Sequence, residues 1–310
     1  MSAPALINIH NDFLSPEISL DGLLNEVDSF VIKHLSSGLE AIPNSVNVAE
    51  YAAKYHLATP GHKVRARLCV TACLELKIKH NDMLIISAVS ELLHNASLIH
   101  DDIQDLDEMR RGVETVWKKF GSNIAICAGD LLLSTAYGVL ANISEPKFLH
   151  KLIKTINERT ASVIRGQCDD IECKHRPINS VETYARIAKA KSGALLGLPI
   201  ELALILAEKD EHLNLAKNAA GAFAVGYQIA DDLNDIEKDA SGNGSTKSLN
   251  IVFVLSEAGS TTPINDAIKF AEQSLSEAVR LAEKLPQSLG ALIIRLAHQL
   301  QGQIKYERKS

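Results

Sequence analysis

The apolar residues of this chain recur at helical spacing over most of its length. Between Ile85 and Ile103 they follow one another at steps of about three or four residues, which places them on one face of an α-helix. Similar runs cover residues 131–140, 152–164, 181–206, 216–236 and 267–285, with short polar breaks between them. No convincing alternating run of the strand type appears, and no break resembles an interdomain linker. The pattern predicts an all-α fold, with a single helical domain over residues 1–310.

The composition narrows the function classes. The 310 residues are 46% hydrophobic, which suffices for a large core. The net charge of -6 leaves no basic footprint for nucleic acid and no polybasic membrane anchor, and an aromatic content of 5% disfavours base-stacking surfaces. The N-terminus lacks the pattern of a signal peptide, and we find no membrane-spanning run of about 18 apolar residues. We therefore expect a cytoplasmic protein that binds no nucleic acid and does not span a membrane.

The five cysteines indicate core packing and a reducing compartment. No paired Cys-x-x-Cys set of the zinc type is present. Cys69 and Cys73 are four residues apart within an apolar helical run, so we interpret them as buried core residues.

Two acidic clusters share the form DDxxD, and in each the first and last aspartates project together from a helix. A solvated acidic face is the alternative. Against it, each cluster ends a strongly apolar segment, the first has no basic residue one turn away, and the pattern occurs twice. Close carboxylates repel unless a cation lies between them, and Mg²⁺ prefers such oxygen ligands together with substrate phosphates. The predicted metal ligands are Asp101, Asp102, Asp105, Asp231, Asp232 and Asp235.

Two arginines follow the first cluster. Arg110 and Arg111 precede Gly112, a sequence that suits a helix C-cap, where the arginines would complement the helix terminus. The alternative is bidentate recognition of phosphate oxygens, which their position after an acidic cluster favours.

Together these segments resemble the trans-isoprenyl diphosphate synthases, also called polyprenyl synthetases. The match runs through DDIQDLDEMRRG, TVWKKFG, AGDLL, GQCDD, AKAKSG and YQIADDLND, in the family's order, over about residues 50–255. The resemblance implies a helical bundle around a deep central cavity, a homodimer, and about three Mg²⁺ ions per active site. It implies condensation of isopentenyl diphosphate with an allylic diphosphate to make a linear all-trans prenyl diphosphate, geranylgeranyl diphosphate or longer.

The resemblance also implies roles for individual residues. Arg110 would bind the allylic diphosphate, and Arg111 and His94 would bind isopentenyl diphosphate. The catalytic set would be Asp101, Asp105, Arg110, Lys191, Gln228 and Asp231. The substrate-binding set would be His62, Lys63, Arg65, His94, Arg110, Arg111, Lys191, Ser192, Gln228 and Lys247.

The chain departs from the family pattern where GGKRxRP is usual. The segment here reads PGHKVRA, with His62 in place of lysine and Lys63 beside it. The isopentenyl diphosphate site is therefore expected to be more sensitive to pH. The segment that would carry Lys247 is short.

The resemblance also implies that the residues just before the first cluster line the pocket into which the product chain grows. Ala96 and Ser97 are small, so a growing chain would pass them and reach Leu93. The alternatives are a farnesyl diphosphate synthase, a class I terpene cyclase, a head-to-head synthase of the squalene type, and a non-catalytic partner subunit. Both acidic clusters are retained, which disfavours the partner subunit. Asp235 and Asp239 stand where a terpene cyclase carries a hydroxyl residue and a glutamate, so the synthase pattern fits better than the cyclase pattern.

Overall fold

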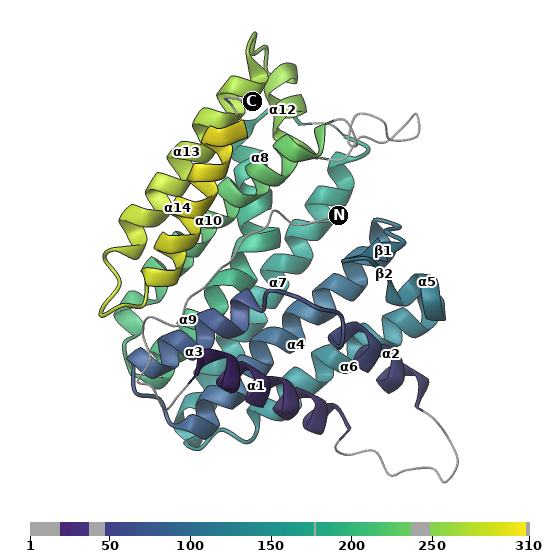
Figure 1. The fold of residues 1–310 in the computed structure, drawn as a ribbon, viewed down its shortest axis with the longest axis vertical. Coiled ribbons are helices and arrows are strands. Elements are labelled where there is room, and N and C mark those ends of the chain that lie inside the picture. Colours follow the sequence, from purple (N-terminus) through teal and green to yellow (C-terminus); the bar gives the residue numbers. More distant parts are fainter. Residues whose placement is uncertain (1–18, 37–46, 177, 237–248, 308–310) are drawn as a thin grey trace. The chain divides into compact units, whose positions relative to one another are not determined.

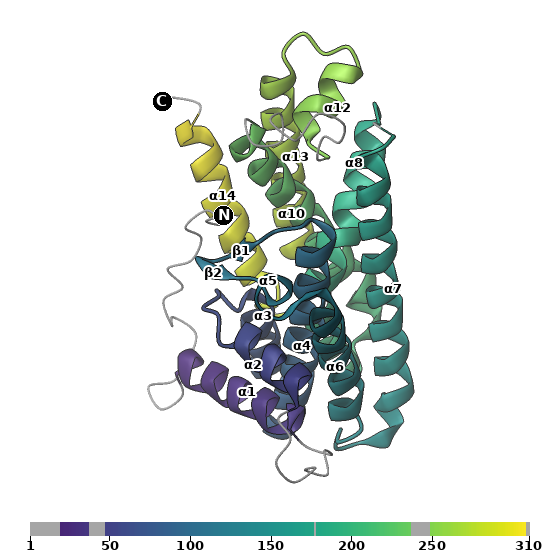
Figure 2. The same ribbon diagram turned by 90° about the vertical axis from the view of Figure 1, so that its right-hand side faces the viewer.

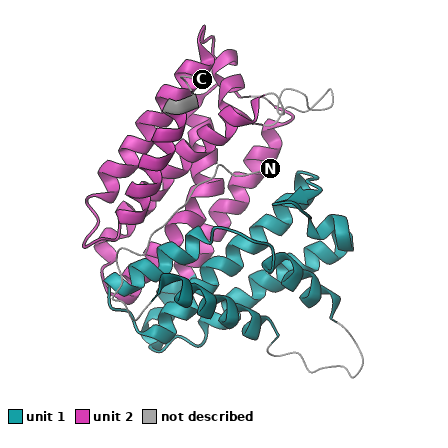
Figure 3. Ribbon diagram, in the orientation of Figure 1, with its two compact units in different colours: residues 1–2, 7–153 teal, residues 3–6, 154–310 magenta. Residues whose placement is uncertain are grey.

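The structure is a computed structural model that describes residues 19–36, 47–176, 178–236 and 249–307 (Figure 1). These residues are almost entirely helical, and the strands among them form a single two-stranded hairpin, so the all-α prediction is confirmed. The described residues divide into two compact units, one up to residue 153 and one from Lys154 on (Figure 3). The predictions of one domain and of a central cavity stay predictions.

Unit 1 is built on one long apolar helix, α4 (His80–Gln104), which packs against α1, α3 and α6. Ser19 and Asn47 begin α1 and α2 by accepting hydrogen bonds from Gly22 N–H (3.0 Å) and Glu50 N–H (3.1 Å), caps typically worth ~1 kcal/mol each. The other elements are α1 (Leu20–Leu35), α2 (Val48–Leu57), α3 (Val64–Glu75), β1 (Met109–Arg110), β2 (Val113–Glu114), α5 (Val116–Phe120), α6 (Ser122–Leu140) and η1 (Pro146–Phe148).

Unit 2 is built on α10 (Leu213–Asn234), which packs against α9 and α13. In α9 (Ala194–Leu206) every residue from Ala194 to Ile205 is buried, as its continuous apolar sequence predicts. Helices α13 and α14 lie side by side in both views (Figures 1 and 2). The other elements are α7 (Leu149–Cys173), whose first residues belong to unit 1, α8 (Val181–Ala188), η2 (Lys189–Gly193), η3 (Asp210–His212), α12 (Ile251–Glu257), α13 (Pro263–Ala282) and α14 (Ala291–Glu307).

Among the residues that the structure describes, two helices, α4 and α6, are long and apolar enough to cross a membrane by length and composition alone. Within the fold, 67% of the most apolar 18-residue stretch of α4 is buried, and 39% of the corresponding stretch of α6 is buried. Core helices of globular proteins meet the same test, so the prediction that the chain does not span a membrane stays a prediction. Cys69 and Cys73 are fully buried, which confirms their interpretation as core residues.

Candidate active site

The first acidic cluster lies at the C-terminal end of α4. The helix ends at Gln104, and Asp105 is its C-cap residue, whose N–H donates to the carbonyl of Asp101 (2.9 Å). The C-terminus of a helix carries partial negative charge, so carboxylates at this end are disfavoured unless a cation offsets them. The position of the cluster in the helix therefore fits a cation site.

The middle aspartate of this cluster turns toward Arg110. Asp102 is 1% exposed, and its Oδ1 accepts from Nε (2.7 Å) and Nη2 (2.6 Å) of Arg110. Burial raises the pKa of Asp102 to about 6, although Arg110 acts in the opposite direction. Among the described residues, none donates a hydrogen bond to its buried Oδ2. An unsatisfied carboxylate oxygen beside Asp101 fits a hydrated Mg²⁺ ion, which prefers oxygen ligands.

The two arginines sit on a β-hairpin and not at a helix terminus. Strands β1 and β2 pair antiparallel, with Arg110 opposite Val113. Between them Arg111 (φ 53°) and Gly112 (φ 83°) form a two-residue turn with positive φ at both positions, as type I′ hairpins require. The prediction that Gly112 caps a helix is therefore wrong: the glycine serves the turn, and the turn sends the two arginines in different directions.

Arg111 reaches back to the segment before α3. Its Nη1 donates to the carbonyl of Pro60 (3.1 Å), and its guanidinium lies directly over Gly61. A Cβ added at Gly61 would lie 2.2 Å from Nη1, so only glycine leaves room for this position of the arginine. The glycine of the PGHKVRA segment is thus explained by a neighbouring side chain.

The predicted basic residues of this segment differ in their surroundings. His62 is exposed, and its carbonyl accepts from Nε of Arg67 (3.2 Å). Lys63 forms an ion pair with Asp28 of α1. Arg65 is half-buried and lies within electrostatic range of His94.

Two imidazoles lie near the arginines: His56 is buried and His94 is half-buried. Burial lowers the pKa of His94 well below its usual value, and the charges of Arg65 and Arg111 add to the effect. Burial likewise lowers the pKa of His56 to about 4, followed by the charges of Arg110 and Arg111. Sequence reasoning missed His56, because a histidine in an apolar helical run reads as an ordinary core residue. Unit 1 thus concentrates positive charge around neutral imidazoles, an arrangement suited to an anion.

The second acidic cluster repeats this arrangement in unit 2. Helix α10 ends at Asn234, and Asp235 is its C-cap residue, whose N–H donates to Asp231 O (3.1 Å). The middle residue, Asp232, is 4% exposed. It accepts from the Tyr184 hydroxyl (2.7 Å), Nε2 of Gln228 (3.0 Å) and the backbone N–H of Ile251 (2.8 Å). Asp232 and Gln228 are thus bound to each other, and Asp232 anchors α8, α10 and the start of α12.

Lys191 and Ser192 lie on η2, a π-helical segment between α8 and α9. Single π-helical turns inside helices occur frequently at functional sites. Lys191 Nζ donates to Asp170 of α7 (2.6 Å), one turn after Gly166. A Cβ at Gly166 would lie 2.6 Å from the backbone nitrogen of Lys191, so α7 and η2 approach closely only because Gly166 lacks a side chain. Gly166 and Asp170 are the first and last residues of the GQCDD motif, so the motif is the sequence feature that could have identified both.

The predicted chain-length residues lie on α4. Ala96 and Leu93 are each 3% exposed, and Ser97 Oγ donates to the carbonyl of His94 (2.7 Å). Lys247 lies outside the described residues. Within the described part of the chain, no group of three or more His, Cys, Asp or Glu side chains is placed so that it could hold a metal ion. The predicted metal and substrate roles stay predictions.

Known proteins resemble this chain over most of its length. Residues 46–287 match the family described as Polyprenyl synthetase. The short chain isoprenyl diphosphate synthase of Methanocaldococcus jannaschii is 30% identical over 213 residues, 68% of this chain and 65% of that protein. The all-trans-nonaprenyl-diphosphate synthase (geranyl-diphosphate specific) of Rhodobacter capsulatus is 29% identical over 244 residues, 78% of this chain and 72% of that protein.

The fold is also found among solved structures. The geranylgeranyl pyrophosphate synthetase of the archaeon Geoglobus acetivorans superposes with a TM-score of 0.77 at 22% identity, over 91% of this chain and 98% of that one. At this identity the similarity establishes the fold, and the family match over residues 46–287 establishes the relationship. Two DDxxD clusters at helix ends, the basic residues of unit 1 and this match agree: the chain belongs to the polyprenyl synthetase family.

Proposed function

We propose that this protein is a Mg²⁺-dependent trans-prenyltransferase, which joins isopentenyl diphosphate to an allylic diphosphate and makes a linear all-trans prenyl diphosphate. The observation that carries the proposal is the pair of DDxxD clusters, each at the negative end of a long helix. Carboxylates held there need a cation, and Mg²⁺ bound to one or two carboxylates binds diphosphates. The names of the relatives, which are isoprenyl and nonaprenyl diphosphate synthases, support the same reaction.

The reaction begins when the carbon–oxygen bond of the allylic diphosphate breaks. The six clustered aspartates would hold Mg²⁺, about three ions, which would supply Lewis-acid neutralisation of the departing diphosphate. Lys191 and Arg110 contribute positive charge to the same diphosphate, and Ser192 and Gln228 direct dipoles toward the allylic cation. The double bond of isopentenyl diphosphate, held by Arg65, His94 and Arg111, then attacks the cation. A proton leaves the new carbon skeleton to the released diphosphate, so no protein base is required.

The product is proposed to be geranylgeranyl diphosphate or longer. Support comes from Ala96 and Ser97, small side chains one turn before the first aspartate cluster, which leave space for a long chain. The relatives' names extend from short-chain to nonaprenyl products, so they are compatible with this range.

The direct test is prenyl transfer by the purified protein. It is incubated with Mg²⁺, isopentenyl diphosphate and allylic primers of increasing length, and the dephosphorylated products are separated by chromatography. Asp101→Asn and Asp231→Asn are expected to lose most turnover and keep the helical circular dichroism, because each removes a predicted metal ligand. The control Glu277→Gln alters a surface ion pair on α13 and should keep full turnover. Full turnover in both aspartate variants would refute the metal assignment, and no product from any primer would favour a non-catalytic partner subunit.

We also propose that the protein is a homodimer and is located in the cytoplasm. Light scattering after size-exclusion chromatography tests the dimer, and a monomeric mass with full turnover would contradict it.

A further inference from the structure

The N-terminus of α3 has an unusual charge balance. Its N-cap residue, Lys63, makes no side-chain capping hydrogen bond, and the first turn contains no acidic residue. Instead Lys63, Arg65 and Arg67 place positive charge at the end of the helix that already carries partial positive charge. Such a terminus suits an anion or a carboxylate, because the first N–H groups of a helix need partners from outside the helix. Lys63 and Arg67 are ion-paired with Asp28 and Asp21 of α1.

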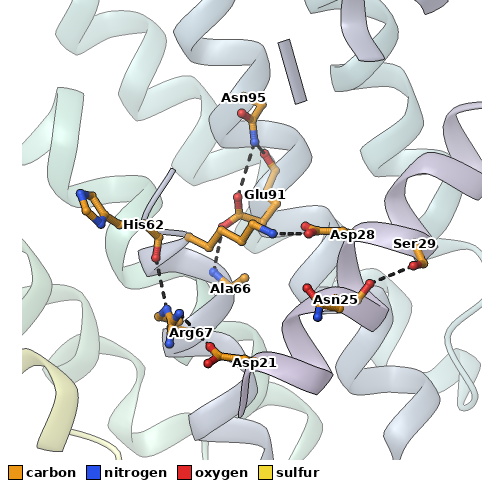
Figure 4. A network of polar contacts seen from close by, with 10 residues as sticks. Asp21, Asn25, Asp28, Ser29, His62, Ala66, Arg67, Glu91 and Asn95 are labelled. Carbon is orange, nitrogen blue, oxygen red and sulfur yellow. Dashed lines mark hydrogen bonds and ion pairs between the residues drawn. The ribbon is translucent and has the colours of Figure 1, made fainter. Parts of the chain in front are cut away.

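Glu91 of α4 supplies the missing cap from another helix. Its Oε1 accepts the backbone N–H of Ala66 (2.9 Å), the third residue of α3 (Figure 4). Burial raises the pKa of Glu91, while this hydrogen bond and the charge of Arg65 act in the opposite direction. The carboxylate thus takes the place of the N-cap side chain that Lys63 cannot provide.

The same carboxylate is connected to the imidazoles of His56 and His94. Asn95, one turn further along α4, donates through Nδ2 to the carbonyl of Glu91 (2.8 Å) and is within 3.5 Å of its Oε2. Asn95 also hydrogen-bonds His56 of α2. His94 follows Glu91 by three residues on α4 and lies near Arg65. Glu91 therefore links α2, α3 and α4 at the place where the basic residues of unit 1 gather.

A half-buried negative charge beside an anion site would by itself weaken anion binding. The hydrogen-bonding pattern supplies a different reason for its presence. We propose that Glu91 is a positioning residue, which caps α3 from α4 and thereby holds Arg65 and His94 in place for the diphosphate of isopentenyl diphosphate. The inference rests on the proposed function in taking these residues as the isopentenyl diphosphate site.

Isothermal titration calorimetry measures the binding of inorganic pyrophosphate in the presence of a metal chelator. It distinguishes the effect of the hydrogen bond that Glu91 accepts from α3 from the effect of the negative charge of Glu91. Glu91→Met fills the space but accepts no hydrogen bond, and should weaken binding by about tenfold. Glu91→Gln keeps an acceptor for Ala66 and should bind within about threefold of the wild type. The control Asp28→Asn removes an acid of the same network that caps nothing, and should leave binding unchanged or tighten it. Tighter binding by Glu91→Met, as charge alone predicts, would overturn the proposal, as would a wild type that binds no pyrophosphate.

Steady-state kinetics provide the second measurement. Glu91→Met should raise KM for isopentenyl diphosphate by about tenfold and leave KM for the allylic primer within about threefold, because only one site loses its cap. Equal changes in both would indicate general disruption and overturn the assignment. If circular dichroism shows Glu91→Met unfolded, the titration of Glu91→Gln decides, since a tenfold loss there would refute the cap. A wild type that transfers no prenyl group but shows the expected pyrophosphate pattern would refute the proposed function and leave the positioning role intact.

Discussion

The buried imidazole of His56 links the stability of unit 1 to pH. Its side chain is 6% exposed, and burial together with Arg110 and Arg111 lowers its pKa to about 4 from the ordinary value of 6.5. Between these two values the unfolded chain binds a proton that the folded chain does not. The free energy of unfolding must therefore fall as the pH falls through this window, and level off below it.

The size of the effect follows from the two pKa values. At about pH 5 the unfolded imidazole is almost fully protonated and the folded one about a tenth protonated, which costs ~2 kcal/mol of folding free energy. The pKa of His94 is shifted in the same direction, so the wild type should lose more than this amount in total. The change His56→Gln removes the titrating group and keeps a side chain that can hydrogen-bond Asn95.

Urea denaturation followed by circular dichroism measures the contribution. The difference in unfolding free energy between wild type and His56→Gln should move by ~2 kcal/mol in favour of the variant between about pH 7.5 and about pH 5. The control His150→Gln, at an exposed position of α7, should show no such movement. If the wild type and His56→Gln lose equal stability over this range, burial and the charges of Arg110 and Arg111 do not hold the folded imidazole of His56 neutral, and this account of His56 is wrong.

The remaining predictions concern close approaches and chain length. Gly61→Ala should raise KM for isopentenyl diphosphate with little change in melting temperature, because the new Cβ displaces only the flexible end of Arg111. Gly166→Ala should destabilise the protein by ~2 kcal/mol, because the new Cβ meets the backbone of η2. Gly302→Ala, in open space on α14, should stabilise the protein by ~0.5 kcal/mol. Thermal melting compares the two variants. Ala96→Phe should shorten the product and retain turnover, and an unchanged product distribution would show that residue 96 does not face the chain.

The helices and the acidic clusters could be predicted from the sequence alone. Helical periodicity is a local property, repeated every few residues, so the apolar runs around α4 and α10 indicate helices without any knowledge of tertiary contacts. The spacing of the aspartates placed them on those helices, and the order of the motifs indicated the polyprenyl synthetase family, which the family match confirms. Both helices end at the fourth residue of the motif, and the fifth residue is the C-cap, a detail that the sequence left open.

Only the tertiary structure decided what the individual polar side chains contact. The sequence treats the aspartates of each cluster alike, yet Asp102 turns to Arg110, and Asp232 to Tyr184 and Gln228. Tyr184 comes from another helix, and Arg110 from a hairpin that pattern reasoning mistook for a helix end.

The cap that Glu91 gives to Ala66 joins residues on different helices in the same way. Periodicity identifies the buried face of a helix, but which helix packs on that face depends on the fold of the whole unit. Contacts between distant residues, and the glycines that leave room for them, therefore appear only when the helices are packed.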